Sequence, residues 1–435
     1  MVTCLVRAGF HYLPTHPVPH GHDEITVPLH RRASLVSENG VFNLERATAL
    51  TIATQNKHRQ NLVNLRKNAG EDALPPGAVI NAVAILPSRI ANNLLEKRQS
   101  VSLTDEDDVE WLGTASVGTP LQSFMIDYDT GSSDFWVPSS LCKTTVCMSK
   151  RRFDTSLSST SERQYGVFEI GYGDGSMVVG QIWSDVVNVA GIKAIGQYFS
   201  PVTTLSDDFN GDPLDGIMGL AFPSLSEMNA SPFLQTARTQ GTCHTGTFAF
   251  YLSTNGSELH LCGTNHRLYR GGIEYHNVTY MVDSHGRKFP GFWQIGSASA
   301  SLNGVRVNGT FETIIDSGTT IMYGPPDAVA ALYAQVHGSK LFEKDQGLYS
   351  FPCNAVPRLV FSWGGKDWHV SKENMNLGTT EDGSSDCVGA LAGRDMGLGT
   401  NVWLLGDSFM KNVYSVFDFD KEAVGFAQLA DSAPS

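Results

Sequence analysis

Asp-Thr-Gly-Ser-Ser at residues 129–133 and Asp-Ser-Gly-Thr-Thr at residues 316–320 are two copies of one motif, and each follows an apolar, strand-like run. An aromatic residue stands seven positions after each Asp, and a Pro nine positions after it. Ninety positions after each Asp comes a Gly, Gly219 or Gly406. A single Asp-x-Gly-Ser is most simply a turn. Two copies in the same register instead indicate an internal repeat that can bring two carboxylates face to face.

Facing carboxylates suit the hydrolysis of an amide by an activated water. Two like charges that lie close together cannot both ionise, so such a pair shares one proton. The ionised member acts as general base on the water, and the protonated member donates to the carbonyl oxygen of the substrate. We expect Asp129 and Asp316 to be this catalytic pair, with neither role assigned permanently to one residue.

The residues that follow each Asp fit this chemistry. A Gly allows the backbone to turn sharply and to approach both the carboxylates and a substrate. Hydroxyl groups at the second motif position can bridge the two loops, and hydroxyls at the fourth position can hold the outer carboxylate oxygens. The predicted supporting residues are Thr130, Gly131, Ser132, Ser317, Gly318 and Thr319.

Composition predicts a mainly β protein of two domains with extensions. The chain has 435 residues, and short alternating runs such as residues 248–252 are typical of strands joined by tight turns. Residues 1–98 hold 11 Lys and Arg against 7 Asp and Glu, a net charge of +4, whereas the remainder holds 20 against 37, a net charge of −17. Such an acidic body does not suit nucleic acid or an anionic membrane as partner. No apolar run is long enough to span a membrane.

Residues 1–98 have the features of a leader with a basic pro-segment. A basic, helix-compatible run at residues 56–68 stops before Gly70, and Leu-Pro-Pro-Gly at residues 74–77 breaks it. The dibasic pair Lys97-Arg98 precedes a polar, acidic stretch, which favours processing near Gln99; the alternative is an ordinary surface pair. We expect the basic segment to cover the carboxylates at neutral pH and to release them in acid. The pattern leaves open which basic residue does so.

The cysteines and the glycosylation sequons favour a secretory route. Six Cys in the acidic body suggest three disulfides and an oxidising compartment. Cys243 and Cys262 flank a predicted hairpin and are expected to pair, and no His completes a zinc site, so no metal is expected. Sequons begin at Asn229, Asn255, Asn277 and Asn308. The first residues lack a clear signal peptide, so the true start is expected upstream or is wrongly assigned. Secretion is the prediction, and vacuolar retention is the alternative.

From about Trp111 to the C-terminus the chain resembles the pepsin-like (A1) aspartic endopeptidases, and most of all the fungal secreted acid proteases. The resemblance rests on both Asp motifs together with Gly-Thr-Pro at residues 118–120, Asp-Gly-Ile-Met-Gly-Leu-Ala at residues 215–221, Phe-Trp-Gln-Ile at residues 292–295 and Leu-Gly-Asp at residues 405–407. In the leader, residues 27–32 are similar to the first strand of such a pro-segment.

This resemblance implies an all-β, bilobal fold of two pseudo-symmetric, barrel-like lobes with a central cleft. Residues 99–275 would form the N-terminal lobe with Asp129 and the flap, and residues 276–435 the C-terminal lobe with Asp316. The protein would be a monomeric zymogen that needs no cofactor, with extended polypeptides and its own pro-segment as partners. The pairs Cys142–Cys147 and Cys353–Cys387 match disulfide loops of the family, whereas Cys243–Cys262 does not match the middle pair of the animal enzymes.

Residues 169–176 match the family's flap hairpin. Tyr172 and Gly173 would lie at the tip, where Tyr172 is similar to the flap tyrosine and Trp136 can hydrogen-bond its hydroxyl. Taken alone, Tyr172 is an ordinary turn aromatic. Acidic residues at Asp127 and Asp174 resemble a fungal pattern that implies cleavage after Lys as well as after hydrophobic residues. The alternative for Asp174 is a solvated surface acid.

Two other functions are weighed against this one. A binding protein on the same fold that has lost catalysis would normally lack one Asp or a motif Gly, and all are present here. The chain contains neither Gly-x-Ser-x-Gly nor His-Glu-x-x-His, which removes the usual signatures of serine esterases and zinc proteases.

Overall fold

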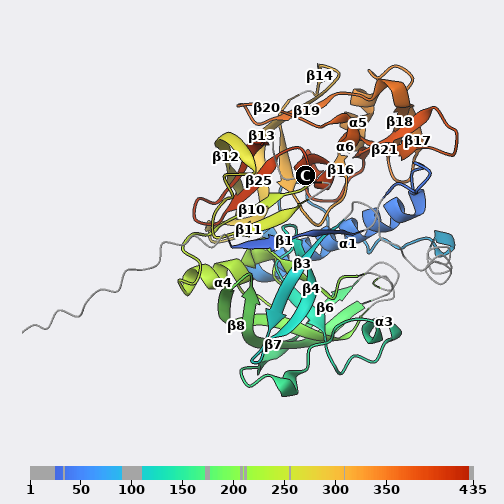
Figure 1. The fold of residues 1–435 in the computed structure, drawn as a ribbon. Helices are drawn as coiled ribbons and strands as arrows, with labels where there is room; N and C mark the ends of the chain where they lie inside the picture. The colour runs from blue at the N-terminus through green and yellow to red at the C-terminus, as the bar shows by residue number, and fades with distance from the viewer. Residues whose placement is uncertain are drawn as a thin grey trace, which may run out of the picture.

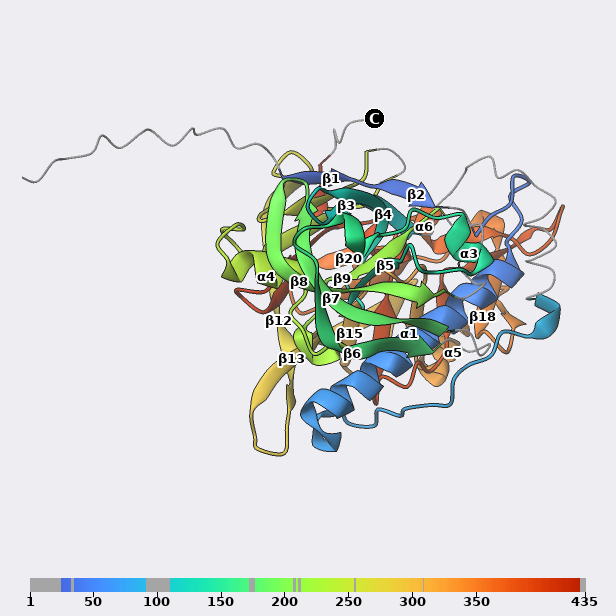
Figure 2. The same ribbon diagram turned by 90° about the horizontal axis from the view of Figure 1, so that it is seen from below.

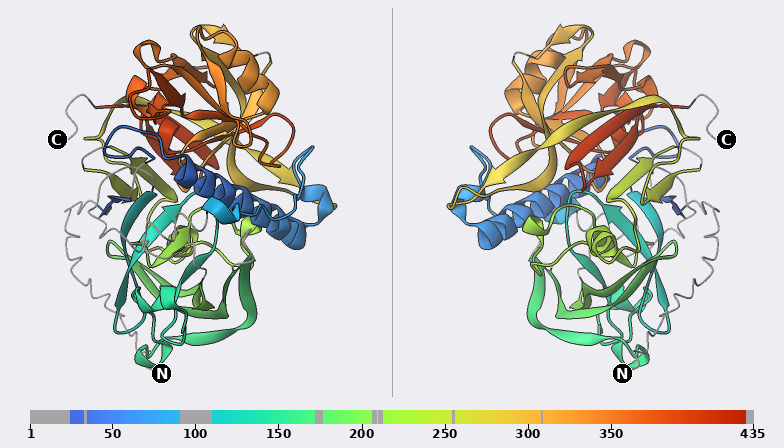
Figure 3. Two further views of the ribbon diagram at one scale, coloured as in Figure 1. Left: turned by 90° about the vertical axis from the view of Figure 1, so that its right-hand side faces the viewer. Right: turned by 90° about the vertical axis from the view of Figure 1, so that its left-hand side faces the viewer.

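The chain folds into two lobes with a long helix between them. The structure, a computed structural model, describes residues 25–32, 35–90, 110–171, 177–205, 209, 213–253, 256–307 and 309–430. Helix α1 (Leu44–Ala69) lies between the teal-green lobe and the orange-red lobe in the views of Figures 1 and 3. The described residues are mostly strand, which confirms the predicted all-β class. No helix among them is both long enough and apolar enough to cross a bilayer.

The lobe that carries Asp129 is built on an eight-stranded sheet. The sheet places a parallel pair, β4 and β9, beside the motif loop and ends in the long antiparallel hairpin of β6 and β7. In spatial order its strands are β2 (His30–Arg32), β3 (Glu110–Val117), β4 (Gln122–Asp129), β9 (Gly216–Gly219), β5 (Phe135–Pro138), β8 (Ile192–Thr204), β7 (Met177–Val189) and β6 (Glu162–Gly171).

The lobe that carries Asp316 contains most of a larger sheet, which also includes strands at residues 26–28, 247–251 and 258–261. Its main path runs through β1 (Thr26–Pro28), β11 (Glu258–Leu261), β10 (Thr247–Tyr251), β25 (Tyr414–Asp418), β26 (Ala423–Leu429), β12 (Tyr269–Val282), β13 (Lys288–Leu302), β15 (Phe311–Ile315), β24 (Val402–Leu405), β16 (Met322–Gly324) and β23 (Leu391–Gly393). Strands β14 (Val305–Arg306), β19 (Leu359–Ser362) and β20 (Asp367–His369) branch from it. A separate small sheet contains β17 (Lys340–Glu343), β18 (Leu348–Pro352), β22 (Asp386–Gly389) and β21 (Asn376–Thr379).

The sequence repeat is also a repeat of topology. In one half β4 pairs in parallel with β9, and β9 pairs antiparallel with β5. In the other half β15 pairs in parallel with β24, and β24 pairs antiparallel with β16. Each motif therefore forms the loop between two strands that are held apart by a third strand from much later in the chain. This arrangement places both Asp residues at strand ends.

Helix α1 has clear start and stop signals. The Asn43 side chain accepts from the Arg46 amide at the N-terminus, and Gly70 caps the C-terminus. Glu45 in the first turn and two basic residues in the last turn complement the helix dipole. The predicted run of residues 56–68 is thus the second half of a 26-residue helix. Most of its buried positions are polar, so hydrogen bonds contribute to its docking, while Leu62 and Leu65 pack into the hydrophobic core.

The segment before α1 is part of the sheets. Strand β1 pairs with β11, and β2 pairs with β3, so residues 26–32 join the two lobes at the edge shown in Figure 2. The remaining helical elements are short: α3 (Thr145–Met148), α4 (Phe233–Thr239), α5 (Pro326–Tyr333), α6 (Lys372–Met375), α7 (Asp407–Met410), η1 (Glu71–Ala73), η2 (Thr155–Leu157), η4 (Pro223–Leu225) and η5 (Cys353–Ala355).

An aromatic cluster packs where the two lobes meet. Trp293 is fully buried, its ring lies 4.4 Å from that of Phe222 and 5.3 Å from that of Phe417, and its indole N–H donates to the Leu220 carbonyl. Phe222 belongs to the half of the chain that contains Asp129, whereas Trp293 and Phe417 come from the other half. Burial of such large rings stabilises the contact between the lobes.

The predicted lobe boundary at residue 275 falls inside strand β12 and stays a prediction. The sequence around residues 270–272, Arg-Gly-Gly, is typical of a turn. It lies instead in β12, where the register against β26 shifts between Arg270 and Glu274. Glycines that signal a turn in the sequence here mark an irregularity within a strand.

The structure contains all three expected disulfides, namely Cys142–Cys147, Cys243–Cys262 and Cys353–Cys387. Cys243–Cys262 brackets the hairpin of β10 and β11, as expected. Cys353–Cys387 spans 34 positions, whereas Cys142–Cys147 spans only five.

Replacing both cysteines of one pair by Ser should destabilise the protein more when the pair closes a longer loop, with a loss that grows as the logarithm of loop length. On chain entropy alone we expect a loss of about 3.8 kcal/mol for Cys353–Cys387 and about 2 kcal/mol for Cys142–Cys147. Denaturant unfolding of the two double variants measures the difference. Equal losses would contradict the loop-length explanation.

Candidate active site

The two motif loops are locked together by reciprocal hydrogen bonds. The Thr130 amide donates to Ser317 Oγ at 3.0 Å, and the Ser317 amide donates to Thr130 Oγ1 at 2.9 Å. Each hydroxyl then donates to a carbonyl on the opposite loop, that of Ile315 or that of Tyr128. All of these groups are buried, so each bond satisfies a donor or acceptor that water cannot reach.

Each Asp is held by the same two bonds from its own loop. The Asp takes one bond from a backbone amide two positions later and one from a hydroxyl three positions later. The bonds are Gly131 N to Asp129 Oδ1 at 2.9 Å, Ser132 Oγ to Asp129 Oδ2 at 2.5 Å, Gly318 N to Asp316 Oδ1 at 3.0 Å, and Thr319 Oγ1 to Asp316 Oδ2 at 2.6 Å. These contacts fix the plane of both carboxylates.

The motif glycines are required because each lies very close to the Asp side chain of the other motif. A Cβ on Gly131 would lie 2.3 Å from Asp316 Oδ1, and a Cβ on Gly318 would lie 2.2 Å from Asp129 Oδ1. Any side chain at either position would therefore push the opposite carboxylate away. The glycines let the two acids face each other.

The glycines ninety positions later have a related explanation. Gly219 pairs with Asp129 in the parallel ladder, and a Cβ there would lie 2.4 Å from the Ser133 amide nitrogen. A Cβ on Gly406 would lie 2.0 Å from the Thr319 carbonyl oxygen. In both halves the late strand thus passes directly against the backbone of the motif loop.

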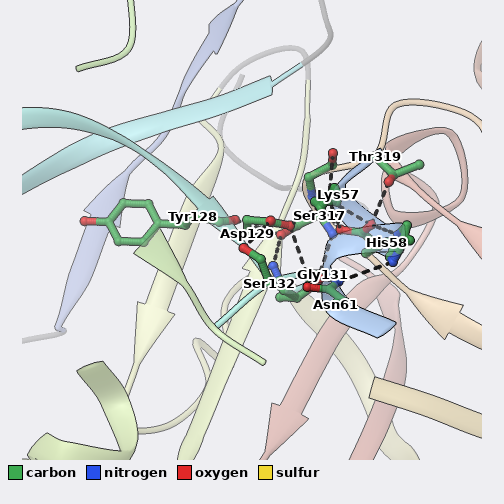
Figure 4. Close-up of polar contacts among 12 residues, drawn as sticks. Lys57, His58, Asn61, Tyr128, Asp129, Gly131, Ser132, Ser317 and Thr319 are labelled. Carbon is green, nitrogen blue, oxygen red and sulfur yellow. Dashed lines mark hydrogen bonds and ion pairs between the residues drawn. The ribbon is translucent and has the colours of Figure 1, made fainter. Parts of the chain in front are cut away.

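Lys57 of helix α1 sits between the two carboxylates. Its ammonium nitrogen lies 3.0 Å from Asp129 Oδ1 and 3.0 Å from Asp316 Oδ1, and it also donates to the Gly318 carbonyl at 3.1 Å (Figure 4). The exposed fraction is 18% for the Lys57 side chain, 3% for that of Asp129 and 0% for that of Asp316. Lys57 belongs to the basic run at residues 56–68, and it is the residue of this run whose ammonium group contacts both acids.

His58 provides a second contact to Asp316. Its Nε2 lies 3.0 Å from Asp316 Oδ2, and its Nδ1 lies 3.5 Å from the side-chain amide nitrogen of Asn61. That amide nitrogen also donates to the Gly131 carbonyl at 2.6 Å. The Nε2 edge of the ring therefore faces Asp316, and a proton on Nε2 donates to Asp316 Oδ2. Figure 4 shows Lys57, His58 and Asn61 gathered beside the motif residues Asp129, Gly131, Ser317 and Thr319.

The electrostatics of the pair are asymmetric. Burial raises the pKa of Asp129, the Lys57 charge opposes this shift, and the negative charge of Asp316 adds to it. Burial acts in the same direction on Asp316, but Lys57 and His58 outweigh it and hold the pKa of Asp316 well below its usual range. For Lys57 the two carboxylates outweigh burial and raise its pKa, so the ammonium keeps its charge. As the pH falls, Asp129 is the first of the two acids to take a proton.

Other residues of α1 contact both lobes on either side of the two acids. On the Asp316 side, Thr51 Oγ1 lies 2.9 Å from the Tyr323 hydroxyl. On the other side, Asn64 donates to the Leu225 carbonyl, and Lys67 pairs with Glu227 at 2.7 Å. The helix therefore covers the region around the dyad and contacts both halves of the repeat.

The residues predicted to set specificity are only partly described. Asp127 lies on β4 two positions before Asp129 and is buried. Strands β6 and β7 form the expected hairpin, with Gly171 opposite Met177. Tyr172, Gly173 and Asp174 lie outside the described residues.

Trp136, the predicted partner of Tyr172, is buried, and its ring packs edge-on against Phe209 at 5.3 Å. Within the described residues no group of three or more His, Cys, Asp or Glu side chains is arranged to hold a metal ion.

Sequence reasoning missed Lys57 and His58 as site residues. Both lie in the run that was recognised as basic and helix-compatible, but this run contains several other basic residues. The register of the helix on the lobes selects Lys57, and only the folded chain contains that information.

Comparison with known proteins agrees with this geometry. The family described as "Eukaryotic aspartyl protease" matches residues 110–429, which is most of the chain. An aspartic protease of Phaffia rhodozyma is 40% identical over 333 residues, covering 75% of this chain and 78% of the relative.

Two animal enzymes are also similar to this chain over most of its length. Pepsin A of Suncus murinus is 30% identical over 379 residues, covering 86% of this chain and 93% of the relative. Cathepsin D of Homo sapiens is 33% identical over 348 residues, covering 74% and 81%. With both Asp motifs and the paired carboxylates in place, the chain belongs to the eukaryotic aspartyl protease family and is an aspartic-type endopeptidase.

Proposed function

We propose that the chain is a zymogen whose residues 1–98 are a leader and pro-segment and whose catalytic residues are Asp129 and Asp316. The observation that carries this proposal is the position of the Lys57 ammonium, within 3.0 Å of both carboxylates. A cation there neutralises the acids and fills the space in which a substrate amide must lie. Residues 99–275 and 276–435 are the proposed lobes of the mature enzyme, with cleavage near Gln99; the Lys97-Arg98 pair lies outside the described residues.

In the mature enzyme the two acids share one proton. One carboxylate takes a proton from the attacking water, and the other donates a proton to the carbonyl oxygen of the peptide bond. Thr130 and Ser317 hold the loops together, while Ser132 and Thr319 orient the outer oxygens. The backbone amides of Gly131 and Gly318 stabilise the charged form of each acid.

Asp129→Asn should reduce kcat by roughly 10²–10⁴-fold, because the variant loses general acid–base catalysis by the pair. The measurement is cleavage of denatured globin at acid pH by material from which residues 1–98 have been removed, with and without a statine-type inhibitor. Wild-type protein that folds and loses its pro-segment but cleaves nothing would instead support a catalytically silent binding protein.

The docked helix should respond to acid. The pKa of Asp316 is depressed while Lys57 and His58 contact it, so its contribution to docking is complete above the ordinary carboxyl pKa of about 4. That contribution is lost as the pH falls through the lower, docked value. The raised pKa of Lys57 means that its charge is present throughout the acid and neutral range. Acid therefore weakens docking through Asp316, not through Lys57.

Lys57→Met should release the pro-segment at neutral pH. Removing one partner of a buried ion pair costs about 3–5 kcal/mol, because the carboxylates remain buried without compensation. The readout is the rate at which trypsin cleaves the pro-segment at pH 7. Lys67→Met is the matched control on the same helix, since its ion pair with Glu227 is half exposed and should contribute at most about 1 kcal/mol. Equal trypsin sensitivity of the two variants would contradict the role of Lys57.

For the substrate, we propose hydrophobic residues around the cut, with Lys accepted immediately before it. Support comes from the carboxylate of Asp127 on the same strand as Asp129 and from Asp174 in the segment that joins β6 to β7. A carboxylate on the segment that covers the substrate would pair with a Lys ammonium.

Asp174→Ala should lower kcat/KM for peptides with Lys before the cut by about tenfold, through loss of a charge-assisted hydrogen bond. Peptides with Leu or Phe at that position should be cleaved as before. Asp382→Ala, at an exposed acid elsewhere, is the control. Unchanged cleavage after Lys in the Asp174 variant would refute the proposal.

Secretion is the proposed location, with the vacuole as the alternative. The three disulfides and the exposed sequon residues Asn229 and Asn277 support passage through an oxidising secretory route. Asn255 and Asn308 lie outside the described residues. Recovery of the mature protein from the culture medium or from the vacuole distinguishes the two locations.

A further inference from the structure

Arg394 lies on the Asp316 lobe beside the strand that follows the second motif. Its amide donates to the Gly324 carbonyl at 2.9 Å, directly after β23, and β23 pairs with β16 so that Ala392 faces Tyr323. Tyr323 in turn contacts Thr51 of helix α1. Arg394 therefore belongs to the surface that the helix covers.

The guanidinium of Arg394 has hydrogen bonds only to uncharged acceptors in the described part of the chain. Nη2 donates to Gln55 Oε1 of helix α1 at 2.9 Å. Nη1 donates to the Asp345 backbone carbonyl and to Gln346 Oε1 at 3.3 Å, and Nε is buried without a hydrogen-bond partner. Burial lowers the pKa of Arg394, and the Tyr323 hydroxyl and the exposed Asp345 are the nearby titratable groups that oppose this shift. A partly buried cation without a hydrogen-bonded carboxylate favours binding of an anion.

The helix indicates how far Arg394 lies from the reacting carboxylates. Thr51, Gln55 and His58 lie on one face at i, i+4 and i+7, and they contact Tyr323, Arg394 and Asp316 in that order. Gln55 precedes His58 by three residues, so the two contacts lie about 4.5 Å apart along the helix axis. An extended substrate advances about 3.3 Å per residue. The side chain that meets Arg394 thus belongs to a residue within two positions of the scissile bond.

We propose that Arg394 is a specificity residue of the mature enzyme, where it binds the carboxylate of a substrate Glu within two residues of the cut. Gln55 of the pro-segment occupies this position as the uncharged isostere of Glu. The inference rests on the proposed function, because it requires that α1 leaves the cleft. A Glu would replace a neutral hydrogen bond by a charge-assisted one, which is roughly twice as strong.

Kinetics with a matched set of peptides test the proposal. One cleavable core carries Glu or Gln at each of the two positions on either side of the cut, and kcat/KM is measured at pH 3 and pH 5.5. We expect a Glu/Gln ratio of about ten at one position at pH 5.5, and a ratio near one at pH 3, where most Glu side chains are protonated. Arg394→Gln should reduce the ratio at pH 5.5 to near one, and a general loss of binding at this position would cancel because Glu and Gln peptides are compared in the same variant. Arg358→Gln, at an exposed Arg on the same lobe, should keep the ratio.

A wild-type ratio near one at all four positions at pH 5.5, or a ratio that survives in Arg394→Gln, would overturn the proposal. Failure of wild-type enzyme to cleave any peptide would instead count against the proposed function. A second measurement uses the full-length chain and does not require the mature form of the variant. Gln55→Glu should slow acid activation at pH 5 about tenfold, and Gln55→Glu combined with Arg394→Gln should not. Equal slowing in the single and double variants would also contradict the proposal.

Discussion

Two buried carboxylates that face each other impose the main constraint on this molecule. Neither Asp129 nor Asp316 is exposed to bulk water, and their mutual repulsion has to be offset by a proton or by a cation. In this structure the cation is Lys57, held in place by a helix that forms hydrogen bonds to both lobes. The polar face of α1, the motif glycines and the paired loops all follow from this requirement.

The same constraint joins inhibition to catalysis. Carboxylates positioned to share a proton over a peptide bond are equally well positioned to share an ammonium group, so a single Lys can occupy the reacting centre. His58 and Asn61 extend this contact by linking Asp316 to the Gly131 carbonyl on the opposite loop. Docking of the helix thus depends on the protonation state of the two acids, and under the proposed function this dependence couples activation to acid.

The side chains of the helix also match the polar groups of the surface that the helix covers. Its residues meet a hydroxyl at Tyr323, a guanidinium at Arg394 and the carboxylates at the centre, each with a complementary group. A segment that occupies a substrate cleft must satisfy the polar groups of that cleft, because a buried group without a partner costs about 1–3 kcal/mol. If α1 belongs to a pro-segment, as proposed, its side chains are therefore a guide to those that a substrate would offer.

The sequence by itself determined the β class, the internal repeat, the candidate acids, the disulfide partners and a basic helix before the body of the protein. Most of these features follow from local pattern and from spacing, as with the Gly that stands ninety positions after each Asp, whereas the pairs Cys142–Cys147 and Cys353–Cys387 were implied by the resemblance to the family. Only the tertiary structure decided that Lys57 rather than another basic residue meets the dyad, that α1 begins at Leu44, and that residues 270–272 continue a strand. The physical reason is the register of the helix on the two lobes. Which of its side chains reaches a buried charge depends on how the whole helix packs, and a local sequence pattern does not contain this information.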